Sequence, residues 1–339
     1  MVSKKAKRGT KKKVNSTKRK TKKIPSQLKD LSLKKSIKDI NQSPGTVFQI
    51  LVSLLRLKEI HNNFDIIIRK KKNVKYTELL YYYFKELFDK EENTFKTQLV
   101  KNYFFCLLIF VNNIDPEETN ILNMNDIYNS INEFKKIYKK NNKNRFFILP
   151  IGLFTNNGAH SNLIIVDFKK NRCEYFEPHG SLYMKGIKNI KNIKNINLNN
   201  PIYNNDYIVR VNCLLYITKL CAKLKIKLIL PDKFMNTNSF QALEEIDKLE
   251  LKAEFQKGDL GGYCQSWSLW YLSLRLKYPD ASPKKLVSHA EKIIKDKYSY
   301  VNFIRNYAKF LYKEEQLYKT IFKTEKEKDN HIKKLFPYY

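Results

Sequence analysis

The chain has 339 residues, of which 42% are apolar, so it can bury a full hydrophobic core in one large domain or two. Lys and Arg number 65 against 33 Asp and Glu, which gives a formal net charge of +32. The longest apolar run, Phe104–Val111, is far too short to span a bilayer, and no apolar segment follows the charged start. We therefore expect a soluble chain with no secretory signal and no membrane partner.

Five scattered cysteines, an odd number, argue against a disulfide framework and favour a reducing compartment. The sequence has no Cys-x-x-Cys pair and no His-Glu-x-x-His motif, so we expect no metal site. It also lacks a phosphate-binding glycine loop and a Gly-x-Ser-x-Gly turn, which are typical of nucleotide-binding proteins and serine hydrolases. We expect no cofactor.

Residues 1–39 are predicted to form a disordered basic tail. Residues 1–23 alone hold twelve Lys or Arg and no acidic residue. Such a tail can bind nucleic acid through its phosphates or act as a nuclear-localisation address. The body is also rich in Lys, but alongside Asn, Ile, Tyr and Phe, which share AT-rich codons. We therefore assign binding of DNA or a virion core to the tail rather than to the body.

Residues 40–140 are predicted to form a helical N-terminal domain. Ser43 and Pro44 are typical of a helix start, and apolar residues follow them at helical spacing. The polar run at 139–144 marks the boundary to a second domain, residues 141–339. Further helical patterns lie at Tyr76–Phe88, Thr97–Val111 and Asn125–Tyr138.

From Phe146 onward the pattern changes to an α+β arrangement. Short apolar runs with β-branched and aromatic residues predict strands, and longer runs without Gly or Pro predict helices. The predicted strands are Phe146–Leu149, Leu163–Phe168, Cys173–Phe176 and Lys227–Pro231. The predicted helices are 206–222, 264–277, one beginning at Ser282 and Pro283, and 299–320.

Cys264 follows the glycines Gly261 and Gly262 and opens the predicted helix 264–277. Two glycines allow a sharp turn before the helix. At the first turn of a helix, unpaired N–H groups and the helix dipole stabilise a thiolate. Cys264 is therefore the candidate nucleophile. The other cysteines, Cys106, Cys173, Cys213 and Cys221, lie in apolar settings and are interpreted as inert core residues.

His160 and Glu177 flank a predicted hairpin, one at the start of its first strand and the other at the end of its second. Those two ends are neighbours in an antiparallel pair, so the imidazole and the carboxylate can meet there. A carboxylate on one ring nitrogen orients the other nitrogen toward a thiol, as in a Cys-His-acid triad. His179 is interpreted as a structural residue of the turn Pro178–Gly180, with lining of the site as the alternative.

This ordered set of His160, Glu177 and a distant Gly-Gly-Tyr-Cys resembles the adenain and SUMO-protease clan of cysteine proteases. It is most similar to the branch of large DNA viruses, which includes the polyprotein-processing protease of African swine fever virus. The resemblance covers residues 145–310 and implies an adenain-like, papain-like core with a central sheet flanked by helices. It also implies that Gln256, eight residues before Cys264, helps to bind the oxyanion. Gln265 or Asp259 remain alternatives for part of that role.

The resemblance implies a cysteine endopeptidase that cleaves after Gly-Gly-type sites in viral structural precursors during virion maturation. A deSUMOylase or deubiquitinase acting on ubiquitin-like conjugates is the alternative within the enzyme class. A basic nucleic-acid-binding core protein with an inactive protease-like fold is the alternative outside it. We expect a location in the virion core and the viral factory of the host cytoplasm, with the nucleus as a further option.

Overall fold

The hairpin predicted around His160 lies at the centre of the fold. In the computed structural model, strand β6 (Gly158–Asp167) pairs antiparallel with β7 (Arg172–Phe176). Asn171 in the turn has a φ of 47°, a left-handed conformation that asparagine adopts more readily than most residues. The structure describes residues 47–70, 103–105, 107–111, 124–155, 158–181, 205–250, 263–297, 299–321 and 324–336.

A mixed six-stranded sheet extends from this hairpin. Its further strands are β1 (Phe64–Asp65), β4 (Leu108–Val111), β5 (Phe146–Thr155) and β8 (Lys227–Ile229). The order is β1-β5-β6-β7-β8, and β4 also pairs with β5. The parallel strands β1 and β4 meet β5 on either side of Pro150, which has no N–H to donate to a neighbouring strand. Strands β2 (Ile68–Lys70) and β3 (Tyr103–Phe105) form a separate two-stranded sheet.

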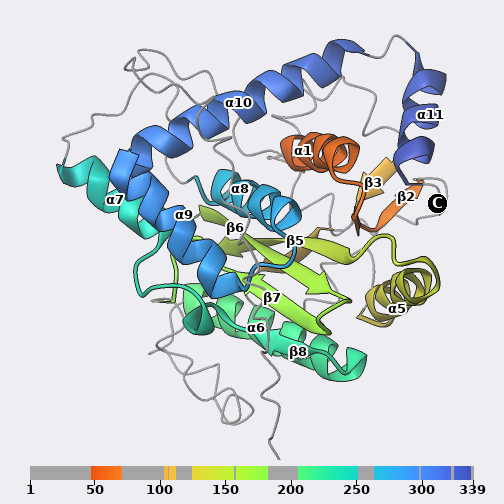
Figure 1. Ribbon diagram of the computed structural model, residues 1–339, viewed down its shortest axis with the longest axis horizontal. Helices are drawn as coiled ribbons and strands as arrows, with labels where there is room; N and C mark the ends of the chain where they lie inside the picture. The colour runs from red at the N-terminus through yellow and green to blue at the C-terminus, as the bar shows by residue number, and fades with distance from the viewer. Residues whose placement is uncertain are drawn as a thin grey trace, which may run out of the picture.

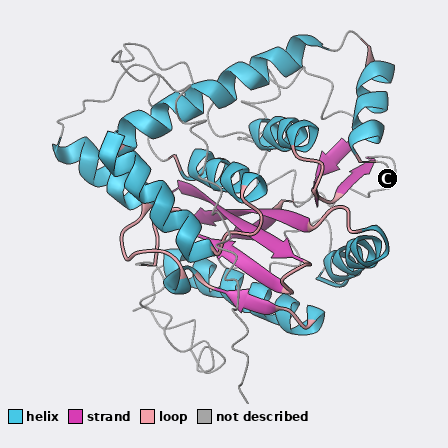
Figure 2. Ribbon diagram, viewed as in Figure 1, coloured by secondary structure: helices cyan, strands magenta, loops and turns pink. Residues whose placement is uncertain are grey.

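Helices cover both faces of the sheet (Figures 1 and 2). Alternate residues of β6 point to opposite faces, so Leu163 and Ile165 belong to one core and Ile164 and Val166 to the other. One face carries α1 (Val47–Ile60), α7 (Phe240–Glu250), α8 (Cys264–Lys277), α9 (Pro283–Lys297), α10 (Tyr300–Ile321) and α11 (Glu325–Leu335). The other carries α5 (Met124–Asn141) and α6 (Asn205–Leu224).

Helix α8 is held on the sheet by buried charged groups near its C-terminal end. The Arg275 guanidinium and the Glu174 carboxylate of β7 form a fully buried ion pair at 3.0 Å. The Tyr271 hydroxyl donates a hydrogen bond to the same carboxylate, also at 3.0 Å. A buried carboxylate and guanidinium are tolerated only with such partners. This cluster therefore ties the orientation of α8 to that of β7.

Aromatic packing holds the N-terminal half of α8. The Trp267 ring stacks on Phe240 of α7 and on Phe303 of α10, with ring centroids 5.3 Å and 5.7 Å apart. Its indole N–H donates a hydrogen bond to Glu244 at 3.0 Å, so this buried polar atom is satisfied. Trp267 and Trp270 both lie in the core.

The helix predicted at Thr97–Val111 is wrong. The described part of that range forms strands β3 and β4, and β4 pairs with β5. The run from Tyr103 to Val111 is rich in aromatic and branched residues, and a short apolar run does not distinguish a buried strand from a buried helix.

The boundary expected at 139–144 falls between α5 and β5, but elements from both sides of it share one sheet and one core. β1 and β4 pair with β5, and α1 packs against α8 and α10. The described residues of 40–140 therefore include strands as well as helices. The basic tail 1–39 and the helix predicted at Tyr76–Phe88 lie outside the described residues.

The other predicted elements lie close to those observed, with β5 and β6 longer than predicted and β8 shorter. The α+β class is confirmed. Helices α7 and α11 were not predicted from the sequence. Within the part of the chain that the structure describes, no helix is long and apolar enough to cross a membrane.

Candidate active site

Cys264 is the first residue of α8, as predicted, and is 8% exposed. The preceding residue, Tyr263, caps the helix without a side-chain hydrogen bond. The first N–H groups of α8 therefore have no side-chain acceptor at the N-cap, and they and the helix dipole favour negative charge at this end. This position is suited to a thiolate.

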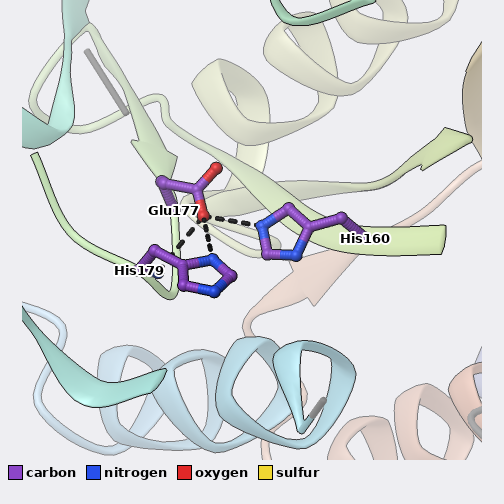
Figure 3. Close-up of side chains that lie close together, drawn as sticks. All are labelled: His160, Glu177 and His179. Atoms are coloured by element: carbon purple, nitrogen blue, oxygen red, sulfur yellow. Dashed lines mark hydrogen bonds and ion pairs between the residues drawn. The ribbon is translucent and has the colours of Figure 1, made fainter. Parts of the chain in front are cut away.

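His160 and Glu177 meet where β7 ends. His160 lies on β6, and Glu177 directly follows β7, so the hairpin brings the two side chains together as predicted. The distance from His160 Nε2 to Glu177 Oε1 is 2.6 Å, as Figure 3 shows. A contact this short is typical of a charge-assisted hydrogen bond.

The Glu177 carboxylate is buried and has further partners. Asn162 Nδ2 donates to Oε2 at 3.0 Å, and an Arg210 nitrogen of α6 lies 3.3 Å from the same oxygen. The His179 backbone N–H donates to Oε1 at 3.2 Å. Burial acts to raise the pKa of Glu177, but His160, the His179 side chain and Arg210 outweigh it and hold the pKa well below its usual range. Glu177 is therefore an anion that faces His160.

His160 and Cys264 each stabilise the charged form of the other. Burial acts to lower the pKa of His160, but the Glu177 carboxylate and the Cys264 thiolate outweigh it and raise the pKa to about 10. Burial acts to raise the pKa of Cys264, but the His160 imidazolium outweighs it and lowers the pKa. Since Nε2 of His160 faces Glu177, Nδ1 is the nitrogen left for the thiol. This arrangement can hold a thiolate–imidazolium pair.

Backbone groups beside His160 face α8. The Ser161 N–H interacts with the Cys264 thiolate and helps to lower its pKa. The Ser161 carbonyl accepts a hydrogen bond from Ser268 of α8. The Gln265 side-chain amide donates to Gln49 of α1 at 2.9 Å, so this amide interacts with α1. Gln256 and Asp259 lie outside the described residues.

His160, Glu177 and His179 also form a cluster of metal-type donors. One donor atom from each lies within 4.8 Å of the other two, which is close enough to share a cation. In the structure these atoms contact one another: both rings approach Glu177 Oε1, at 2.6 Å and 3.5 Å (Figure 3). The donor atoms are thus joined by a hydrogen bond between His160 and Glu177 and a longer ion-pair contact between His179 and Glu177.

Sequence reasoning missed two partners of Glu177. Asn162 lies two residues after His160. Residues i and i+2 share a face of a strand, so the sequence could have predicted that Asn162 lies on the same face as His160. Arg210 lies on α6 and carries no local signal in the sequence. The contact of His179 with Glu177 makes His179 part of the site, which was the alternative reading of this residue.

Comparisons with known proteins give a narrow result. No protein-family profile and no solved structure matches the chain. A protein of Acanthamoeba polyphaga mimivirus that is named as an ankyrin repeat protein is 31% identical over 169 residues. The aligned region covers 50% of this chain and 20% of the mimivirus protein, so the chain matches about a fifth of that relative's length. The similarity links the sequence to a giant virus.

Proposed function

We propose that the protein is a cysteine endopeptidase with Cys264 as nucleophile, His160 as base and Glu177 as the acid that orients the imidazole. The observation that carries the proposal is the 2.6 Å contact between Glu177 and a histidine that also interacts with the Cys264 thiol. The position of Cys264 at the start of α8 adds the field of a helix N-terminus to that of the imidazolium.

The proposed reaction uses the thiolate–imidazolium pair directly. The Cys264 thiolate uses an electron pair to form a bond to the scissile carbonyl carbon, and the π electron pair of the C=O bond moves onto the carbonyl oxygen. The backbone N–H of Cys264 and the Gln256 side-chain amide would donate hydrogen bonds to this oxyanion. His160 gives its proton to the leaving amine, and a thioester remains. His160 then takes a proton from water, which hydrolyses the thioester and restores the enzyme.

The proposed substrate is a structural precursor polyprotein cut after Gly-Gly-type sites during virion maturation. This assignment comes from the family resemblance, and the similarity to a mimivirus protein supports a viral setting. Glycine also suits a buried nucleophile, because it lets the substrate backbone approach closely. The corresponding location is the virion core and the viral factory in the host cytoplasm, with the nucleus as an option through the basic tail.

Profiling with a Gly-Gly-x peptide library tests this proposal. The wild-type protein is expected to cleave after the second glycine, and Cys264→Ala is expected to cleave nothing. Replacing the glycine before the scissile bond with leucine should lower turnover far more than a change four or five residues upstream. Equal rates for the glycine and leucine peptides would contradict the proposed specificity. Preferential cleavage of ubiquitin-like conjugates over peptides would favour the isopeptidase alternative.

A nucleic-acid-binding role is the second candidate function, and the twelve Lys or Arg within residues 1–23 favour it. Deleting residues 1–38 separates the two functions. The shortened protein is expected to cleave short peptides at the wild-type rate but to lose salt-dependent binding to DNA. DNA binding by a wild-type protein that cleaves no peptide would instead support the inactive core protein.

A further inference from the structure

The turn that carries Glu177 is hydrogen-bonded to residues at the start of α7. The backbone N–H of Ser239 donates to the His179 carbonyl at 3.3 Å, and the N–H of Gln241 donates to the Pro178 carbonyl at 3.0 Å. Gly180 closes the turn, with its N–H on the Glu177 carbonyl at 2.9 Å and a φ of 91°. The position of the Glu177 carboxylate therefore depends on α7 as well as on the hairpin.

The His179 side chain lies between Glu177 and α7. Its Nδ1 is 3.5 Å from Glu177 Oε1, and its Nε2 is 3.1 Å from Glu245 Oε1. Its ring lies against the His160 ring, with centroids 4.8 Å apart and planes inclined by 38°. Figure 3 shows both imidazoles directed at the same carboxylate oxygen. His179 is 9% exposed in its side chain, whereas Glu245 is 55% exposed.

We propose that His179 is a positioning residue of the site: it holds Glu177 in place for His160. In its protonated form, which the Glu245 carboxylate favours, it also contributes positive charge near the Cys264 thiolate. This inference rests on the proposed function of the site. A residue of this kind acts through Glu177 and His160 without touching the substrate. Its removal is therefore expected to lower kcat more than it raises KM.

The charges around His179 favour its protonated form. Burial acts to lower the pKa of His179, but Glu177 and Glu245 outweigh it and raise the pKa, while His160 opposes them. The His179 charge in turn helps to lower the pKa of Cys264 on α8. Arg210 of α6 faces Glu177.

Two variants of His179 separate the polar contact of its side chain with Glu177 from its charge. Asn places an amide donor close to the position of Nδ1 but carries no charge, whereas Ala removes both and keeps the backbone N–H that donates to Glu177. Glu245→Gln keeps the length of the side chain and removes the charge that favours protonation of His179. His289→Gln on α9 is the matched control for loss of a histidine elsewhere on the same core.

The measurements are the rate of iodoacetamide alkylation of Cys264 against pH, followed by peptide mass, and kcat and KM on a Gly-Gly peptide. We expect the acid limb of alkylation to move to higher pH by up to about one unit in both His179 variants, and less in Glu245→Gln. Because Asn keeps the donor, we expect His179→Ala to lose kcat by up to about 100-fold and His179→Asn to recover part of that loss.

An unshifted acid limb in His179→Ala and His179→Asn, with circular dichroism as in the wild type, would overturn the inference. Equal kcat losses in the two variants would overturn the role of the His179 side chain in holding Glu177. Alkylation does not depend on the substrate, so it tests the inference even when no peptide is cleaved. A protein that shows the shifted limb but cleaves no peptide would contradict the proposed function and leave the role of His179 supported.

Discussion

Ser268 of α8 donates a hydrogen bond from its hydroxyl to the backbone carbonyl of Ser161 on β6, with 3.1 Å between the two oxygens. Ser161 directly follows His160, and Ser268 lies about one helical turn after Cys264. The bond thus helps to set the position of α8 along β6 and so of Cys264 beside His160. A variant that shifts α8 should lower the reactivity of Cys264 even when Cys264 is unchanged.

Replacing Cys264 with Ala is expected to abolish peptide cleavage and labelling by a thiol-reactive probe. The truncation is small, so the free energy of unfolding should change by no more than about 0.5–3 kcal/mol, which urea denaturation measures. Cys213→Ala is the matched control, because Cys213 is a buried thiol on α6 at the other face of the sheet. The control should keep both labelling and cleavage. Wild-type turnover in Cys264→Ala would remove Cys264 from the site.

The pH dependence of kcat/KM is expected to be bell-shaped. The acid limb reports formation of the thiolate, and the alkaline limb reports loss of the His160 proton near its pKa of about 10. Glu177→Gln removes the anion that raises the pKa of His160, so the alkaline limb should move to lower pH. His160→Ala should lose nearly all turnover, and Glu177→Gln less. An alkaline limb that stays in place in Glu177→Gln would contradict this pairing.

Gly180→Ala is expected to disturb the turn that holds Glu177. A Cβ there would lie 2.6 Å from the Asn236 carbonyl oxygen, and the φ of 91° disfavours alanine. We expect a loss of stability on the order of 1–3 kcal/mol together with slower alkylation of Cys264. Gly152→Ala is the control, since its added Cβ would meet the Phe154 ring, which can move. A Gly180→Ala protein as stable and reactive as the wild type would refute this account of the turn.

Arg275→Met is expected to destabilise the protein by up to about 3–5 kcal/mol, because it breaks a fully buried ion pair and leaves Arg172, at 2.9 Å, as the remaining cation beside the Glu174 carboxylate. Glu174→Gln combined with Arg275→Met also removes the carboxylate charge and should recover part of the loss. Urea unfolding of the single and double variants measures both values. Additive losses in the double variant would show that the two residues do not stabilise each other.

Stability is also expected to fall as the pH rises from about 4 to about 7 because of Asp65. Burial raises the pKa of this carboxyl to about 7, although the nearby Lys58 ammonium acts to lower it. A folded-state pKa above the unfolded value of about 3.9 means that Asp65 stabilises the fold at low pH and loses this contribution as the pH passes 7. Asp65→Asn should remove that part of the slope in the free energy of unfolding. An unchanged slope would mean that Asp65 is ionised throughout.

The parts of the site that follow from local sequence were predictable. A strand places alternate residues on one face, so the hairpin alone brings His160 to Glu177, and the glycine pair and apolar spacing predict α8 with Cys264 at its start. The partners that come from distant elements were not predictable. Arg210 of α6 and Glu245 of α7 reach the site only through tertiary packing.

The same division explains the error at Thr97–Val111. From Tyr103 to Val111 that segment is apolar throughout, so its sequence carries neither the period of a helix nor that of a half-buried strand. What makes β4 a strand is the edge of β5, which offers hydrogen-bonding groups beyond Pro150. The position of that edge is a property of the whole fold.

The pairing of β1 and β4 with β5 has a practical consequence for anyone who trims this chain. A polypeptide that starts at residue 141, where composition suggests a boundary, would lose both strands and also α1. It would expose one edge of β5 and the apolar surface of α8 that α1 covers. Bare strand edges recruit other chains, so we expect such a fragment to aggregate, whereas a polypeptide that retains α1, β1 and β4 keeps that edge paired.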